Sequence, residues 1–243
     1  MVQNYLPKNQ LPSLNNEYVC WLDLMGTKSL MDRSPTTCTI KICQFHLCLS
    51  NSKIEGISLY PVMDGAFITT GDQDILRNFL QSVFKSLTND FINEGQKNKH
   101  LYQSIIRACI AYGPLGHGRD IQSPHIPPEY KSSLLFGLPM TQAYSSENKA
   151  PPFGIYVHKS ARAFSPVNQK PFSTRWLTWF DSNYNPENLI EQIKGFYMWA
   201  REMSFCLPFR EDTIDTHEKI CYQYLNYYKI NPQGKKTNEE SQS

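Results

Sequence analysis

Two aspartates are the first residues in this sequence that could do chemistry. Asp23 lies inside the apolar stretch YVCWLDLMG, and Gly26 follows it three residues later. A buried carboxylate without a partner is costly, so it requires a counter-charge or a metal ion. Asp64 stands in PVMDGAF, 41 residues after Asp23. Two adjacent carboxylates repel unless a cation lies between them, and with a main-chain carbonyl they suit Mg²⁺ or Mn²⁺.

The spacing of the two aspartates leaves a structural alternative open. Asp23 could cap a turn, and Asp64 could be the ordinary aspartate of an Asp-Gly turn. A zinc site is a weaker possibility, built on Cys38, Cys43 and Cys48 with His46 among them. No C-x-x-C pair occurs in the sequence, and zinc sites usually contain one. We therefore expect these cysteines to pack in or near a helix.

The elements that would position the aspartates follow from hydrophobic periodicity. Residues 18–26 read as a first strand, and residues 36–52 fit either a helix or a strand, with a helix preferred. Asp-Gly flanked by apolar residues predicts two short strands within 56–70. Apolar positions recurring at three and four predict a helix over 71–95, capped by Asp72. Further segments are expected as follows: a strand in 101–118, a loop in 118–133, a short helix in 136–150, a strand in 153–161, and helices in 185–205 and 215–230.

This order predicts an α+β fold with a ferredoxin-like βαββαβ core, extra strands and C-terminal helices. In such a sheet Asp23 and Asp64 face each other across adjacent strands. We expect a flexible arm over 1–15, the core over 16–164, and a helical extension over 165–230 packed on the core. The polar end, 231–243, is expected to be disordered. The aromatic side chains of the extension are interpreted as packing residues: Trp176, Trp179, Phe180, Phe196, Tyr197 and Trp199.

Composition bounds the class of protein. The 243 residues are 40% hydrophobic, enough for a core, and the net charge is only +2, from 24 basic and 22 acidic residues. This balance does not call for a nucleic-acid or membrane partner. No apolar run approaches the roughly 20 residues of a membrane span, and no secretory signal is recognisable at the start. We therefore expect a cytoplasmic protein whose seven cysteines are free thiols.

Four motifs in order resemble the class III nucleotide cyclases. WLDLMGTKSLM resembles the first metal motif of that family, and LYPVMDGAFIT resembles the second. IRACIAYGPLGHG is similar to the family's arginine-containing strand and glycine turn. FGLPMTQAYSSENKA falls where the helix of the dimer face begins. The set covers roughly residues 18 to 160.

The resemblance implies a reaction and a set of residues. Asp23 and Asp64 would bind two Mg²⁺ or Mn²⁺ ions together with the Leu24 carbonyl. The amides that follow, through Gly26, Thr27 and Lys28, would cradle the triphosphate. The product would be a 3′,5′-cyclic monophosphate, with pyrophosphate released. The family also implies a homodimer in which each site takes residues from both chains.

The sequence departs from the family pattern at residues that recognise the base and at residues that stabilise the transition state. Tyr60 stands where adenylyl cyclases carry a base-reading lysine, and Leu134 replaces the purine-reading aspartate. A bulky tyrosine would shorten the base pocket and favour a pyrimidine, although tyrosine is also at home in a strand. Thr141 and Ser145 replace the transition-state asparagine and arginine. Such losses can cost roughly 10²–10³ in rate each.

Several other residues could replace the positive charge that is lost at Ser145. Arg107 is the first candidate, with an outward-pointing strand residue as its alternative. Thr141 could donate one hydrogen bond, or it could cap the helix after Pro139. Arg119, in a loop, is a weaker candidate, and Lys159 and Arg162 are more readily explained as solvated surface charges.

The likeness is closest to bacterial pyrimidine cyclases of anti-phage signalling systems. It implies a uridylate or cytidylate cyclase that makes a second messenger, cyclic UMP or cyclic CMP, for a separate effector protein. One alternative is a cyclase-like nucleotide-binding regulatory domain that has lost turnover. Another is a palm-type enzyme that joins nucleotides, although PVMDGAF lacks the Gly-Gly-Asp-Glu-Phe or Asp-Asp hairpin of such enzymes.

Overall fold

The chain forms a mixed sheet with helices on both faces. A computed structural model describes residues 6–181, 184–203 and 211–230, so the predicted tail 231–243 lies outside the described residues. The core runs in the order β1 (Asn15–Leu24), α1 (Thr27–Arg33), α2 (Pro35–Asn51), β2 (Ser58–Val62), β3 (Gly65–Thr70), α3 (Gln73–Gln96) and β4 (Ile106–His117). This is the predicted βαββαβ order, with two helices in the first connection.

The sheet order brings the two predicted aspartates to neighbouring strands. Seven strands of the described residues pair as β2-β3-β1-β4-β6-β7, with β5 (Leu135–Gly137) paired to β4. β1 is central and antiparallel to both β3 and β4. β6 (Ile155–Val157) extends the sheet parallel to β4, and β7 (Trp176–Leu177) closes the edge. The predicted α+β fold with extra strands is confirmed.

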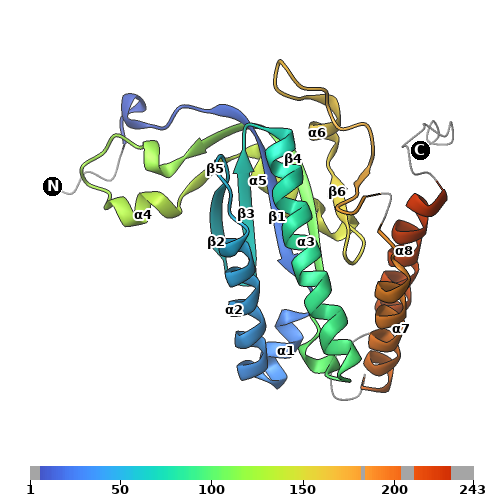
Figure 1. The fold of residues 1–243 in the computed structure, drawn as a ribbon. Helices are drawn as coiled ribbons and strands as arrows, with labels where there is room; N and C mark the ends of the chain where they lie inside the picture. Colours follow the sequence, from blue (N-terminus) through green and yellow to red (C-terminus); the bar gives the residue numbers. More distant parts are fainter. Residues whose placement is uncertain (1–5, 182–183, 204–210, 231–243) are drawn as a thin grey trace.

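Alternation along β1 separates two packed faces. Tyr18, Cys20, Leu22 and Leu24 face the main core, where α2 and α3 supply Phe45, Phe79 and further apolar residues. Val19 and Trp21 face the opposite side, which α5 (Leu138–Ser146) covers. Figure 1 shows α2 and α3 side by side over one face of the sheet. Side chains of successive strand residues point to opposite faces, so Glu17 and Asp23 share the α5 face.

Two helices after the sheet pack beside α3. In α7 (Glu187–Glu202), Leu189, Ile193, Phe196 and Ala200 are buried along one helical face, the spacing of an amphipathic helix. α8 (Glu211–Ile230) lies against α7, and α7 lies against α3. The helices therefore cover the end of the sheet where β1 finishes. Within the described residues, no helix has the length and hydrophobicity needed to cross a membrane.

Most of the predicted elements are present, with corrections near the edges. The segment 36–52 is a helix, as preferred, and Asp72 caps α3 by accepting from the amides of Asp74 and Ile75. The strand predicted in 153–161 stops at Val157, and α6 (Lys159–Ala163) begins with the His158 ring as its cap. The predicted loop contains α4 (Pro128–Ser133). Single turns that periodicity did not predict are η1 (Lys8–Gln10), η2 (His100–Tyr102), η3 (Gly118–Asp120) and η4 (Glu147–Lys149).

Candidate active site

The end of β1 brings Asp23 and Asp64 together. In the register of the sheet, Asp23 lies opposite Gly65 in β3 and opposite Arg107 in β4. Asp64 directly precedes Gly65, and its main-chain oxygen accepts a hydrogen bond from the Leu24 amide at 3.2 Å. The two aspartates therefore lie at one end of adjacent strands, where sequence order and hairpin geometry predicted them.

The Asp64 turn is held from two sides. His46 of α2 donates from Nε2 to the main-chain oxygen of Met63 at 2.8 Å. The Thr27 hydroxyl donates to Oδ2 of Asp64. Gly26, just before Thr27, adopts φ 82° and ψ 6°, a left-handed conformation that is strained for other residues. Gly26 thus allows the chain to turn from β1 into α1 and bring Thr27 onto Asp64.

Arg107 does not point outward into solvent. Its Nη2 donates to Oε1 of Glu147 at 2.6 Å and lies 3.8 Å from Oδ2 of Asp23. The other oxygen of Glu147 accepts from Trp21 Nε1 at 2.6 Å. Glu147 was missed from the sequence, because a carboxylate at a polar helix end carries no signal of its tertiary partner. Its two anchored oxygens fix Arg107 beside Asp23.

Negative charge accumulates around Asp23. Burial and the charges of Glu147 and Asp64 together raise the pKa of the Asp23 carboxyl to about 8, and the charge of Arg107 opposes them. Asp23 and Glu147 share one guanidinium, and the charge of Asp64 acts on Asp23 as well. We call Asp23, Asp64, Arg107 and Glu147 the Asp23 cluster. Such an excess of negative charge is stabilised by a bound cation.

The donor set fits a hard divalent cation. Two aspartate carboxylates and the Leu24 main chain offer oxygen atoms, which Mg²⁺ and Mn²⁺ prefer. Among the described residues, no group of three or more His, Cys, Asp or Glu side chains is arranged around a metal position, and this includes the cysteines considered for zinc. Protein ligands would therefore be few, and water and substrate phosphates would complete the shell, as is usual for Mg²⁺.

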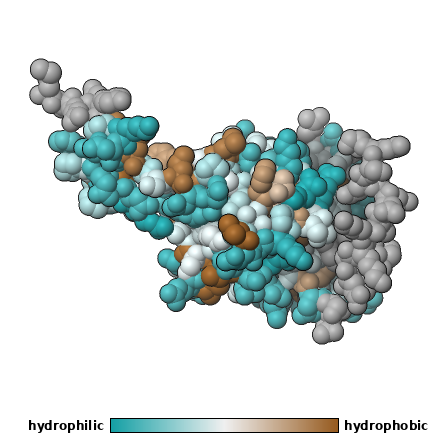
Figure 2. All heavy atoms as spheres, turned by 90° about the horizontal axis from the view of Figure 1, so that it is seen from above, coloured by the Kyte–Doolittle hydropathy of each residue, from teal (hydrophilic) through white to brown (hydrophobic). Residues whose placement is uncertain are grey.

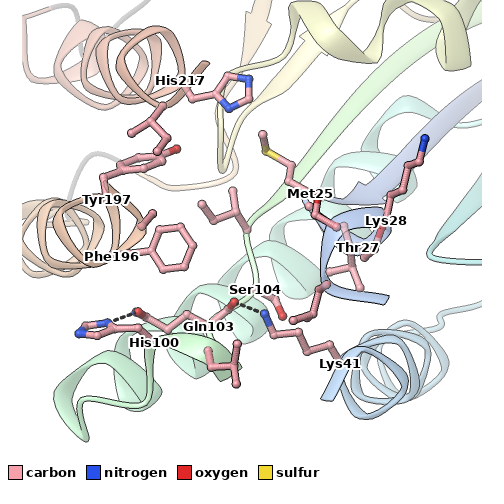
Figure 3. A pocket seen from close by; sticks show the side chains of 18 of the residues that line it. Met25, Thr27, Lys28, Lys41, His100, Gln103, Ser104, Phe196, Tyr197 and His217 are labelled. Carbon is pink, nitrogen blue, oxygen red and sulfur yellow. Dashed lines mark hydrogen bonds between the residues drawn. The ribbon is translucent and has the colours of Figure 1, made fainter. Parts of the chain in front are cut away.

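A pocket of about 380 Å³ opens beside the carboxylates. The predicted residues Asp23, Leu24, Gly26, Thr27, Asp64 and Arg107 all line it. Figure 3 shows that α7 and α8 form its other wall, through Phe196, Tyr197 and His217. The interpretation of these aromatics as packing residues was therefore incomplete for Phe196, Tyr197 and Trp199. They pack, and they also enclose the pocket.

Tyr60 lies outside this pocket, on the α5 face of the sheet. Its hydroxyl is 2.5 Å from Nδ1 of His117, and Nε2 of His117 is 2.9 Å from Oε1 of Glu17. The Tyr60 and His117 rings are stacked, and Tyr60 is only 6% exposed. We call Glu17, Tyr60 and His117 the Glu17 cluster. His117 and Glu17 were not identified from the sequence. His117 is 57 residues from Tyr60 and 100 residues from Glu17, and no local pattern predicts such distant contacts.

Thr141 lies on α5 and also outside the pocket. It is exposed in the middle of α5, whose cap position is Gly137, so it does not cap the helix. The Ser145 hydroxyl donates to the Thr141 carbonyl at 2.6 Å. Arg119 donates to the Ser58 hydroxyl at 3.1 Å and is exposed. Of the four cations considered as replacements for the lost charge, Arg107 is therefore the one that lines the pocket with the aspartates.

Comparisons with known proteins find likeness in structure but not in sequence. No family model matches the chain, and no curated protein matches it. The fold is similar to that of adenylyl and guanylyl cyclase catalytic domains. A monomeric guanylyl cyclase domain from the fungus Blastocladiella emersonii is 16% identical with a TM-score of 0.43, over 62% of this chain and 85% of that one. Adenylate cyclases from Trypanosoma brucei are 11% identical with a TM-score of 0.45, over 67% and 80%.

These similarities are distant. The guanylyl cyclase Cya2 gives 14% identity and a TM-score of 0.44, over 60% of this chain and 76% of that one. At such values they carry no argument about substrate or site residues. The assignments of substrate and site residues rest instead on the geometry of the chain itself.

Proposed function

We propose that this chain is a nucleotide cyclase that converts a pyrimidine nucleoside triphosphate to its 3′,5′-cyclic monophosphate and pyrophosphate. The observation that carries the proposal is that Asp23 and Asp64 lie together at the ends of adjacent strands and line one pocket with the Gly26 turn. A reaction of this type depends on positioning and charge neutralisation more than on covalent chemistry by the protein.

Residues of the chain would divide the work as follows. Asp23, Asp64 and the Leu24 carbonyl would hold two Mg²⁺ or Mn²⁺ ions. The bound ions would supply a lowered pKa for the 3′-hydroxyl and neutralise phosphate charge. The turn through Gly26 and Thr27 would position the triphosphate. The 3′-oxygen then bonds to the α-phosphorus, its proton passes to water, and the bond from that phosphorus to the bridging oxygen breaks. Pyrophosphate leaves.

Arg107 is positioned to take part in this reaction. Its guanidinium lies between Glu147 and Asp23. A guanidinium held in this way can donate to a phosphate oxygen as charge moves onto the leaving group. Because Glu147 fixes Arg107 by a part-buried ion pair, little reorganisation is needed when substrate binds.

The hydrogen bonds of Tyr60 favour cytosine over uracil. In the neutral His117 ring that donates from Nε2 to the Glu17 carboxylate, Nδ1 accepts, and the Tyr60 hydroxyl donates to it. The Tyr60 oxygen then offers lone pairs only. An amino group such as that of cytosine can donate to them, whereas the corresponding carbonyl of uracil cannot. We therefore propose CTP as the preferred substrate and UTP as the second.

We propose that the α5 face binds a second copy of the chain. Exposed apolar side chains interrupt a mostly hydrophilic surface in the view of Figure 2. On and beside α5, Phe136, Leu138 and Tyr144 are exposed by 39%, 61% and 58%. The proposal includes a homodimer in which Tyr60 and Thr141 of one chain complete the site at the Asp23 cluster of the other. It further includes a second-messenger role in anti-phage defence, with a separate effector that responds to the cyclic nucleotide.

The second candidate function is a nucleotide-binding regulatory domain without turnover. Thr141 and Ser145 favour it, because the Ser145 hydroxyl is engaged with its own helix and neither residue carries a charge. Purified protein incubated with each of the four nucleoside triphosphates and Mn²⁺ separates the two functions. Cyclic nucleotide and pyrophosphate in equal amounts support the cyclase. A folded dimer that binds nucleotide but releases no pyrophosphate supports the regulatory domain.

A further inference from the structure

The pocket is lined by side chains of opposite charge. Asp23 and Asp64 lie at the end where β1 finishes, and Lys41 lines the pocket from α2. Figure 3 shows Lys41 reaching toward the connection between η2 and β4, below Thr27. A cavity lined by metal-binding carboxylates and an ammonium group complements a ligand that brings metal ions and anionic oxygens together.

Lys41 occupies a position where helical periodicity calls for an apolar residue. It lies between Cys38 and Phe45, two buried residues on the same face of α2. Its Nζ donates to the main-chain oxygen of Gln103 at 2.6 Å. In the part of the chain that the structure describes, no carboxylate lies within ion-pair distance of this ammonium. A part-buried cation that is paired only with a neutral carbonyl is destabilising.

Burial changes the pKa of Lys41. It lowers the pKa of the Lys41 ammonium to about 8, because the charged form is disfavoured away from water. An anion placed in the pocket would reverse that effect. The charge of Lys41 is therefore costly in the free protein and favourable in a complex with an anion.

The acceptor of Lys41 is held rigidly. The Gln103 side chain is 1% exposed, donates to the Phe91 carbonyl at 2.8 Å, and lies 2.7 Å from Nδ1 of His100. The Gln103 main chain is thereby fixed, and it fixes the ammonium at the pocket wall. An ammonium has three N–H donors, and the bond to Gln103 uses one. The others are available to a ligand.

We propose that Lys41 binds the terminal phosphates of the substrate, and the pyrophosphate after turnover, in the pocket that the metal-binding carboxylates also line. This inference rests on the proposed function and names a further residue of the same site. Terminal phosphates supply the anionic oxygens that the ammonium lacks. The apolar side chains of Met25, Ile105 and Phe196 line the same pocket, and a water-poor wall strengthens the charge interaction.

Lys41 also offers a positive charge that the dimer-face helix lacks. The residues at Thr141 and Ser145 are neutral, so the leaving pyrophosphate receives no charge from them. A fixed ammonium at the terminal phosphates stabilises the charge that builds on the leaving group. It acts within one chain and requires no residue of the second.

Binding of inorganic tripolyphosphate tests the inference without a base or a reaction. Titration calorimetry with Mg²⁺ would compare the native protein, Lys41→Met, Lys41→Arg, and Lys85→Met as a matched control from the exposed side of α3. We expect Lys41→Met to weaken binding about 10-fold. We expect Lys41→Arg to retain most of the affinity and Lys85→Met to be unchanged. Native-like affinity of folded Lys41→Met would overturn the inference.

Stability distinguishes a ligand-binding role from a structural one. Because Lys41→Met removes an unpaired buried charge, we expect the thermal midpoint of the ligand-free variant to be unchanged or higher. A lower midpoint with unchanged tripolyphosphate binding would show that Lys41 only supports Gln103, against the inference. If the variant does not fold, the Lys41 Nζ resonance of the native protein provides the test. It must shift on saturation with tripolyphosphate, and an unshifted resonance would overturn the inference.

Failure of the inference and failure of the proposed function give different results. Cyclic nucleotide production together with Lys41-independent tripolyphosphate binding removes the inference alone. Lys41-dependent binding without cyclic nucleotide from any of the four triphosphates removes the cyclase and leaves a polyphosphate site.

Discussion

Two acidic clusters lie on the same face of the sheet and differ in how completely they are paired. Glu17 and Asp23 are six residues apart on β1, or about 20 Å along the strand. In the Glu17 cluster, one carboxylate bonds to one imidazole, which bonds to one hydroxyl. The Asp23 cluster contains three carboxylates and one guanidinium, which pairs with two of them, Asp23 and Glu147.

The Glu17 cluster is a closed network, in which donors and acceptors are matched. The Asp23 cluster is an open network, in which negative charge is in excess. A network whose donors and acceptors are matched stabilises the fold. A network with excess charge costs stability and is retained where a ligand supplies the missing charge. Loss of a member of the Asp23 cluster should therefore reduce activity more than stability, and loss of a member of the Glu17 cluster should do the reverse.

The largest effect is expected for Asp64→Asn. The amide keeps the size of the side chain but removes a metal-binding charge, so cyclase activity should fall by about 10³-fold or more. The thermal midpoint should stay the same or rise, because repulsion with Asp23 is relieved. Product formation by liquid chromatography and thermal unfolding would be measured together.

Asp32→Asn is the matched control for this change, since Asp32 is exposed on α1 and does not line the pocket. Full activity of Asp64→Asn would place the site elsewhere. A large loss of stability in Asp64→Asn would show that the Asp23 cluster is a closed network like the Glu17 cluster.

The next effect in size is expected for His117→Leu. The change leaves the buried Tyr60 hydroxyl and the half-buried Glu17 carboxylate without their partner, at a cost of about 1–3 kcal/mol in the free energy of unfolding. Denaturant unfolding would measure it, with the exposed His125→Leu as the control. An unchanged free energy of unfolding would contradict the closed-network assignment.

The smallest effect concerns base choice. Tyr60→Phe removes the lone pairs that would accept from cytosine, so the preference for CTP over UTP should fall about 10-fold. The ratio of kcat/KM for the two substrates is the measurement. Tyr112→Phe, on the core face of β4, should leave the ratio unchanged. A ratio in Tyr60→Phe that equals the native one would remove Tyr60 from base selection.

Local patterns in the sequence determined the elements and the place of the aspartates. The apolar run of residues 18–24 ended by a glycine, the Asp-Gly turn at Asp64, and the three-and-four spacing in 73–91 depend only on neighbours in the chain. Together they imply the strand order, and the strand order places Asp23 beside Asp64. Gly26 was recognisable because a tight turn after a strand requires a residue free of Cβ strain.

Tertiary structure alone decided which side chains meet those aspartates. Glu147 and Arg107 are 40 residues apart and His117 and Glu17 are 100 apart, and no local pattern records which strand ends become neighbours. No local pattern distinguishes Lys41 from the other lysines of the chain, and Phe196 was interpreted as a packing residue. Only the packing of α2, α7 and α8 around the end of β1 placed both on the wall of one pocket, because burial and charge pairing are set by contacts between distant segments.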